Sequence, residues 1–189
     1  FYNTQGASAL GLLRAWERSG NSGFMDAAIA NGDCQINDCV PGSTYSIDGS
    51  HRFSSHDALF LEQLSIDSGD SQYANFVGAE YWGRMNNSTY GADANLDAAG
   101  YANSILAIRT GGGTPELAAW DLSKAAIAAH LAGETVARDA FMQVIQASLN
   151  ASDGTHTTYD VVGLTGAVWA SAVTGINLDP TSGKWASAN

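Results

Sequence analysis

The sequence has few positively charged residues, and this scarcity excludes several classes of partner. Lysine and arginine together number 8 in 189 residues, against 19 aspartates and glutamates, so the formal net charge is −11. Nucleic acids and anionic membranes are bound through clustered basic side chains. We therefore expect neither as a partner, whereas neutral glycans and divalent cations are compatible with the acidic composition.

Charge of either sign is also scarce. Charged residues make up 14% of the chain, whereas a typical globular protein has about a quarter. The surface must then be covered largely by serine, threonine, asparagine and glycine, as is common in secreted proteins and in subunits that are buried in an assembly. Hydrophobic residues make up 45% of the 189 residues, which is enough for a substantial core, so we expect one domain over residues 1–189.

No apolar stretch reaches the length that a membrane-spanning helix needs, so we expect no membrane span. The chain begins at Phe1, with neither an initiator methionine nor a signal peptide. This start is consistent with a processed secreted protein or with an excised domain. We expect a secreted protein that works outside the cell or at the cell surface.

Cysteine is almost absent. Cys34 and Cys39 are the only two, and their spacing is not that of a redox pair or a zinc site. We expect a disulfide that closes a small loop, which implies an oxidising compartment. Two free thiols are the alternative.

The established catalytic motifs are missing too. The sequence contains no nucleophile elbow, no phosphate-binding loop and no metalloprotease helix. Gly111-Gly112-Gly113 lacks the lysine of a phosphate-binding loop and indicates the end of a helix.

The residues that are present indicate helices. In residues 55–82, apolar side chains recur at helical spacing on both sides of Ser68-Gly69-Asp70, whose glycine suits a helix end and whose aspartate can cap the next helix. Neither helix can bury its apolar stripe alone, so we expect an antiparallel hairpin. The spacing from Asp57 to Gly69 recurs from Asp121 to Gly133, as is typical of stacked helical arrays. The expected helices cover residues 5–18, 23–30, two parts of 55–82, 95–109, 115–131, 134–149 and 159–174, with irregular loops at 31–53 and 85–100. The predicted fold is all-α, an array of about four helical hairpins with long irregular loops.

Three segments, DALFLEQLSIDSGDSQY, AAWDLSKAAIAAHLAGE and YDVVGLTGAVWASAVTG, resemble parts of α/α-toroid proteins. This superfamily includes the six-hairpin glycosidases, the related polysaccharide lyases and the terpenoid-cyclase-like domains. The resemblance lies in the helical pattern, and the acidic run of the terpenoid cyclases is absent. It implies an open or partial α/α toroid, because a closed ring needs more helices than the chain provides. The alternatives are an open arc, a piece of a longer chain, or a subunit whose edge is covered by neighbours.

The resemblance also implies candidate site residues. In the glycan-active members, an aromatic residue followed by an acid begins the inner helices and lines the central cleft. The pairs that match this pattern here are His56-Asp57, Trp120-Asp121 and Tyr159-Asp160. If the protein is an enzyme, Asp57, Asp121 and Asp160 would supply a general acid and base for glycoside cleavage, with His56 as a proton carrier. Trp120 and Tyr159 would then contact glycan. The simpler alternative is that each aspartate caps a helix.

A loop with alternating oxygen-bearing side chains suggests calcium. Asp93, Asn95 and Asp97 follow the D-x-N-x-D pattern that collects oxygen ligands for this ion. The positions after them do not continue as an EF-hand. The alternative is a solvated loop in which Asp97 caps the next helix. Apart from calcium, we expect no cofactor.

Three asparagines satisfy the acceptor pattern for N-linked glycosylation: Asn86, Asn87 and Asn150. Such patterns are frequent by chance, and their use depends on the host.

The leading functional hypothesis is a secreted, non-enzymatic helical-array domain that acts by association, either as a self-assembling extracellular subunit or as a glycan-contacting module. We expect the apolar ends of the array to pair head to tail, which builds rings or filaments. The residues that form these two ends are Leu10, Leu12, Leu13 and Trp16 in the first helix and Val161, Leu164, Val168 and Trp169 in the last. The alternative is a carbohydrate-active enzyme, a glycoside hydrolase or a polysaccharide lyase.

Overall fold

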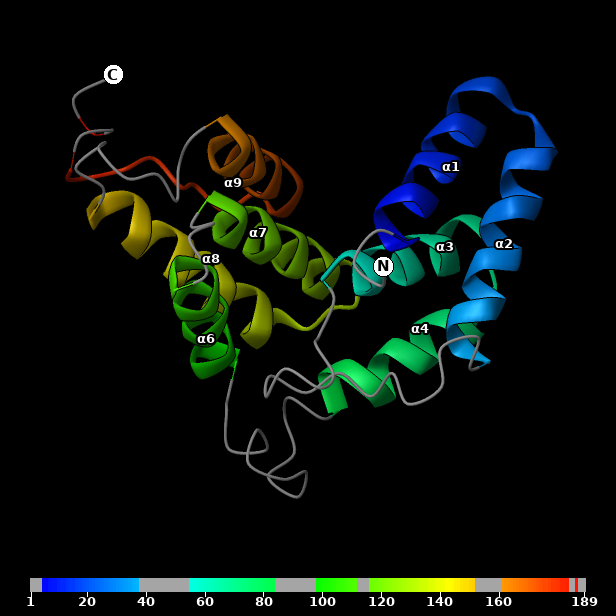
Figure 1. The fold of residues 1–189 in the computed structure, drawn as a ribbon, viewed down its shortest axis with the longest axis horizontal. Coiled ribbons are helices and arrows are strands. Elements are labelled where there is room, and N and C mark those ends of the chain that lie inside the picture. The colour runs from blue at the N-terminus through cyan, green and yellow to red at the C-terminus, as the bar shows by residue number, and fades with distance from the viewer. Residues whose placement is uncertain are drawn as a thin grey trace. The chain divides into compact units, whose positions relative to one another are not determined.

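The computed structural model describes residues 5–37, 55–83, 98–111, 116–151, 161–183 and 186, and within these residues it is helical and contains no strand (Figure 1). The all-α prediction is therefore confirmed at this level. The elements are α1 (Gln5–Ser19), α2 (Ser22–Ile36), α3 (Ser55–Ser68), α4 (Ser71–Val77), the π-helix η1 (Gly78–Trp82), α6 (Ala98–Gly111), α7 (Glu116–Leu131), α8 (Thr135–Ala151) and α9 (Val161–Thr174). None of the described helices is long and apolar enough to cross a membrane.

The chain divides into two compact units, Phe1–Asn95 and Leu96–Asn189. The first contains α1 to η1 and the second contains α6 to α9. Because one domain can contain two compact helical units, this division does not test the prediction of a single domain over residues 1–189, and that stays a prediction.

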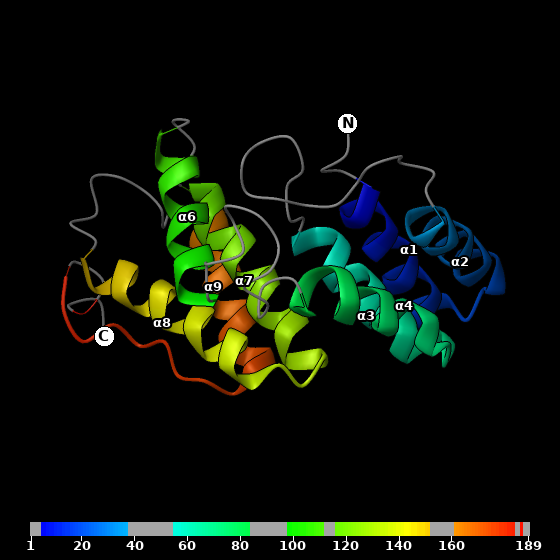
Figure 2. The same ribbon diagram turned by 90° about the horizontal axis from the view of Figure 1, so that it is seen from below.

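In the first unit, α1 packs on α2 and α3, and α3 packs on α4 (Figures 1 and 2). Leu13, Phe60, Leu64 and Val77 form part of its buried core. The chain runs from α4 straight into η1, whose wider turn the sequence pattern does not predict. A π-helix is rare and arises as a local widening of an α-helix.

The helix α2 is longer than the sequence pattern predicts. It extends through Ile36 rather than ending near residue 30, so the prediction of irregular structure from residue 31 is wrong for residues 31–36. Asn31-Gly32-Asp33 resembles a helix stop, but tertiary contacts override that local preference. Gly32 lies against Leu64 and Tyr73, and the Tyr73 hydroxyl donates a hydrogen bond to Asp33 Oδ1 over 2.8 Å.

Three helices end in the same way. At the ends of α1, α3 and α9, a hydroxyl donates to the carbonyl four residues earlier and accepts from the backbone N–H two residues later; these are Ser19, Ser68 and Thr174. The next residue in each case is a glycine with positive φ, namely Gly20, Gly69 and Gly175. Gly133 after α7 also has positive φ. The sequence-based prediction of helix ends at these glycines is confirmed.

In the second unit, α7 is the central helix and contacts α6, α8 and α9 (Figures 1 and 2). Leu122, Ile127 and the alanines around them are buried. Four small residues of α9 are buried, and these are Gly163, Gly166, Ala167 and Ala170. A Cβ on Gly166 would lie 3.2 Å from the Trp120 Cα and 3.0 Å from Ser123 Oγ. The two helices therefore pack closely because their contact residues are small.

The segment after α9 is not helical and returns to the end of α8. The Thr181 N–H donates to Asn150 Oδ1 over 2.9 Å, and Leu178 is buried. Thr181 thus attaches the segment to α8, and Leu178 packs into the core of the second unit.

Candidate functional site

The one predicted acid of the first unit lies at the start of α3. Asp57 is in the first turn and is 2% exposed, and His56 beside it is half-buried. Asp57 and Asp121 belong to different units, and Tyr159 and Asp160 lie outside the described residues. The convergence of the three aspartates on one cleft therefore stays a prediction.

A second buried acid of α3 is not evident from the sequence motifs. Glu62 is 3% exposed and accepts a hydrogen bond from the Trp82 indole N–H over 3.2 Å. The bond connects α3 to η1, so the π-helix is joined to α3 by a buried polar contact. The available signal is the position of Glu62 inside the apolar run ALFLEQL, because an acid in a buried stripe needs a hydrogen-bonding partner.

The acid of the second unit is part of a buried ion pair. Lys124 Nζ lies 3.0 Å from Asp121 Oδ1, and the lysine side chain is 1% exposed. The same ammonium lies 5.2 Å from the centre of the Trp120 ring, and that ring packs against Trp169 with 5.8 Å between centroids. The four side chains connect α7 to α9.

Asp121 does not cap a helix, because it lies inside α7, well after the first residue Glu116. That alternative is wrong for this residue. Its carboxylate instead neutralises a lysine that would be costly to bury alone. Trp120, the predicted glycan contact, packs against Trp169 and Lys124. Both residues thus have a structural explanation within the α7–α9 contact.

One acid of the first unit has a perturbed pKa. Burial raises the pKa of Asp67 above its ordinary value of 3.8, and the nearby Glu17 raises it further, while a hydrogen bond from Gln63 and the charge of Arg14 oppose the shift. Asp67 Oδ2 is buried without a hydrogen-bond partner. A carboxylate with a raised pKa holds its proton more tightly in the folded state, so the free energy of unfolding falls as the pH rises through that pKa.

Replacing Asp67 with asparagine should therefore stabilise the protein at neutral pH. The gain in the free energy of unfolding should be below about 1 kcal/mol, because the site is partly exposed to solvent. It should disappear below pH 3.8, the ordinary value of the group, where aspartate is protonated in both states. Urea unfolding followed by circular dichroism at the two pH values measures the difference. An equal gain at both pH values would show that the charge of Asp67 is not the cause.

The remaining predicted sites lie partly outside the described residues. The calcium ligands Asp93, Asn95 and Asp97 do so entirely, as do Asn86 and Asn87. Elsewhere, in the part that the structure describes, no three His, Cys, Asp or Glu side chains are grouped so that they could hold a metal ion. Both the calcium site and the glycosylation sites stay predictions.

The disulfide also stays a prediction. Cys34 lies in the last turns of α2, and Cys39 lies outside the described residues. Asn150 lies at the end of α8, where its side-chain oxygen accepts from Thr181 N–H and, over 3.3 Å, from Gln146 Nε2.

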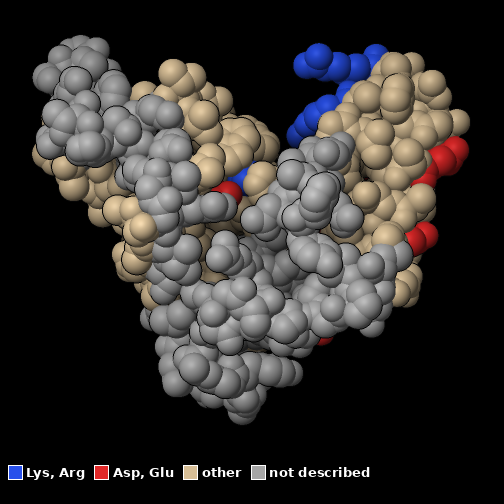
Figure 3. All heavy atoms as spheres, in the orientation of Figure 1, with Lys and Arg blue, Asp and Glu red and all other residues tan. Residues whose placement is uncertain are grey.

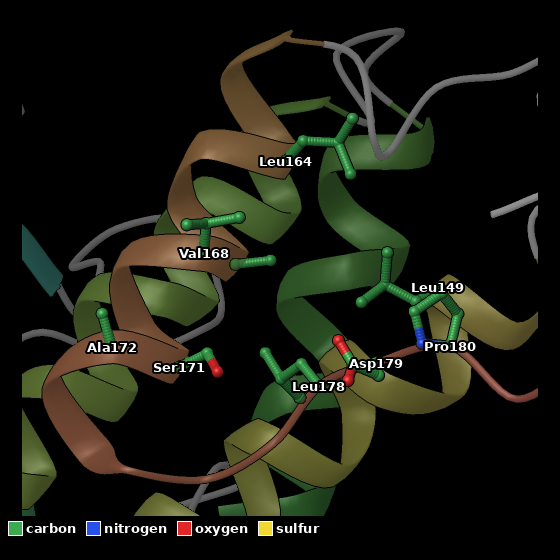
Figure 4. A pocket seen from close by; sticks show the side chains of 9 residues that line it. Leu149, Leu164, Val168, Ser171, Ala172, Leu178, Asp179 and Pro180 are labelled. Atoms are coloured by element: carbon green, nitrogen blue, oxygen red, sulfur yellow. The ribbon is translucent and has the colours of Figure 1, made fainter. Parts of the chain in front are cut away.

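A groove in the second unit runs between α8, α9 and the segment that follows α9. Its volume is about 410 Å³. The residues that line it are Leu149, Leu164, Ala167, Val168, Ser171, Ala172, Leu178, Asp179 and Pro180 (Figure 4). Among the described residues that line it, Asp179 is the only acid, and it is exposed. This described lining is mainly apolar and offers no pair of facing carboxylates that could cleave a glycoside.

One face of α9 beside this groove is exposed. We call it the α9 face and define it by Val161, Thr165, Val168 and Ala172. Val161 is 80% and Val168 68% exposed. Residues 161–174 contain no charged side chain, and the surface over α9 in Figure 3 shows neither sign of charge. The first helix differs, since Leu13 is buried and Leu10, Leu12 and Trp16 are half-buried.

Comparison of the chain with protein families, with characterised proteins and with solved structures finds no match.

Proposed function

We propose that this protein is a secreted, non-enzymatic helical module that acts by self-association, as a building block of an extracellular assembly. The observation that carries the proposal is the α9 face, where two valines are largely exposed on a helix without any charge. Exposed apolar surface beside an apolar groove is typical of a site for another protein surface.

The finer architecture is part of the same proposal. We propose that the helices form hairpins in an open array related to the α/α toroid. The shared endings of α1, α3 and α9 support repetition of one helical unit along the chain. An open array leaves helices at its ends without a neighbour in the same chain, and an exposed apolar face on α9 fits such an end.

The enzymatic alternative has weaker support. A carbohydrate-active enzyme of the toroid type needs two carboxyl groups that reach one substrate. Asp57 is 2% exposed, and Asp121 is engaged by Lys124 inside the second unit. The glycan-contact alternative is weakened because Trp120, one of its predicted contacts, packs against Trp169 between α7 and α9. Association through α9 uses side chains that are already at the surface.

Self-association is expected to appear as a concentration-dependent rise in mass, and replacing Val168 with glutamate should reduce it. The substitution places a charge in an apolar contact, and burying that charge in a complex would be costly. Sedimentation velocity of the 189-residue chain over a range of concentrations measures the effect. The helical circular-dichroism signal should be unchanged, because Val168 is 68% exposed.

A matched control is available on α8. Val136 is 79% exposed and does not line the groove, so Val136→Glu adds the same charge at a similarly exposed position outside the α9 face. This variant should associate like the wild type. A wild-type protein that stays monomeric at all concentrations would refute the proposed function.

A further inference from the structure

We infer that the occupant of the α9 face is α9 of a second copy, packed antiparallel about a two-fold axis. The inference rests on the proposed function and specifies its contact. It differs from the head-to-tail pairing expected from the sequence, which requires a second apolar end on α1. The four α1 residues expected to form that end are buried or half-buried within the first unit, whereas the α9 face is exposed.

The spacing of the α9 face suits a helix. Its four residues follow one another at intervals of four, three and four positions, which is the spacing of the apolar seam in a pair of packed helices. The opposite side of α9 carries Gly163, Gly166 and Ala170, which are already buried. The α9 face is therefore the side of the helix that is left for a partner.

The cost of burying charge favours an uncharged helix as the occupant of the α9 face. The chain has a formal net charge of −11, so copies that approach at random repel one another. A partner helix with charged residues in the contact would have to bury them against the valines of the α9 face. The described helix with the most exposed uncharged apolar surface is α9 itself, since α2 carries Asp26 and Asp33 and the exposed Val136 of α8 lies close to Arg138 and Asp139. A second α9 brings no charge into the contact.

The α9 face is also self-complementary when the two helices run antiparallel. With the two-fold axis at its centre, Thr165 faces Val168 of the second copy, and Val161 faces Ala172 of the second copy. Each contact then occurs twice, as an isologous interface requires. In a parallel pair, by contrast, Val168 would face Val168.

The size of the contact predicts its strength. A helix of 14 residues is about 21 Å long, which is short for a stable interface of about 1,200–2,000 Å². Leu164 and Leu178, which line the groove beside the α9 face, can add apolar area to the contact. We therefore expect reversible dimers rather than a permanent complex.

A charge-swap experiment tests the pairing. Val168→Glu and Thr165→Lys, each made in the full chain, should both weaken dimerisation about 100-fold, because each homodimer buries two unmatched charges. An equimolar mixture of the two variants should regain dimers. In the mixed dimer, the new carboxylate at position 168 of one copy would face the new ammonium at position 165 of the other, while the second Thr165–Val168 contact stays intact. Sedimentation velocity with one variant fluorescently labelled counts the mixed dimers.

The control mixture combines Val136→Glu with Thr165→Lys. It contains the same charges but no facing pair, so no mixed dimer enriched above the statistical share should form. Association of the wild type together with failure of the first mixture to recover would overturn the antiparallel α9 pairing and leave the proposed function standing. A monomeric wild type would overturn both. Circular dichroism of each variant shows that it is folded.

Discussion

Replacing Gly32 with alanine is expected to lower the free energy of unfolding by about 2 kcal/mol. A Cβ at this position would overlap Leu64 Cδ2 and would lie 2.9 Å from Tyr73 Cε1. Leu64 and Tyr73 are both fully buried, and the hydrogen bond from the Tyr73 hydroxyl to Asp33 fixes the ring. Burial and this hydrogen bond also raise the pKa of Tyr73, so the hydroxyl remains a donor at neutral pH.

Gly11 provides the matched control. It lies within α1, and a Cβ there would have no atom within 4 Å. Because alanine favours a helix interior over glycine, Gly11→Ala should raise the free energy of unfolding by up to about 1 kcal/mol. The same substitution should thus have opposite signs at the two positions, as measured by urea unfolding followed by circular dichroism. Stabilisation by Gly32→Ala would show that the close packing of α2 on α3 and α4 is wrong.

Replacing Asp121 with alanine should cost about 3 kcal/mol. It removes a carboxylate that lies 3.0 Å from the ammonium of Lys124, whose side chain is 1% exposed. The remaining positive charge would then be buried beside the Trp120 ring with less compensation. Thermal and urea unfolding measure the loss.

A double variant separates the ion pair from simple packing. Asp121→Leu with Lys124→Met keeps a similar volume and removes both charges, so it should recover most of the lost stability. Glu17→Ala is the surface control, since Glu17 pairs with Arg14 over 2.6 Å at an exposed position, and its cost should be below about 1 kcal/mol. If Asp121→Ala costs no more than Glu17→Ala, the buried pair contributes nothing to folding.

The helical content of the described chain could be predicted because its information is local. The apolar spacing in residues 55–82 and the glycines at helix ends depend on neighbouring residues alone. The sequence predicts helix ends at Gly69 and Gly133, and each has a positive φ. Such signals act within one or two turns, so they are readable without the fold.

What could not be predicted depends on distant residues. The continuation of α2 through Gly32 needs Tyr73 and Leu64 from later helices. The spacing of Asp121 and Lys124 is local, but the burial of their ion pair depends on the helices that pack around α7. The sequence predicts the α9 face in part: of the four apolar residues expected to be presented by this helix, Val161 and Val168 are exposed, whereas Leu164 and Trp169 are half-buried. It does not reveal that small residues turn the other side of α9 toward α7.

The endings of α1, α3 and α9 have a consequence for how such a chain can evolve. Each ending is made by a hydroxyl, a glycine and backbone groups within the same few residues. It needs no side chain from another helix. A gene segment that is copied with this ending therefore keeps its helix boundary at the new location, before any compensating substitution has arisen. Duplication can then lengthen the protein by whole helices, and selection acts afterwards on the packing between them.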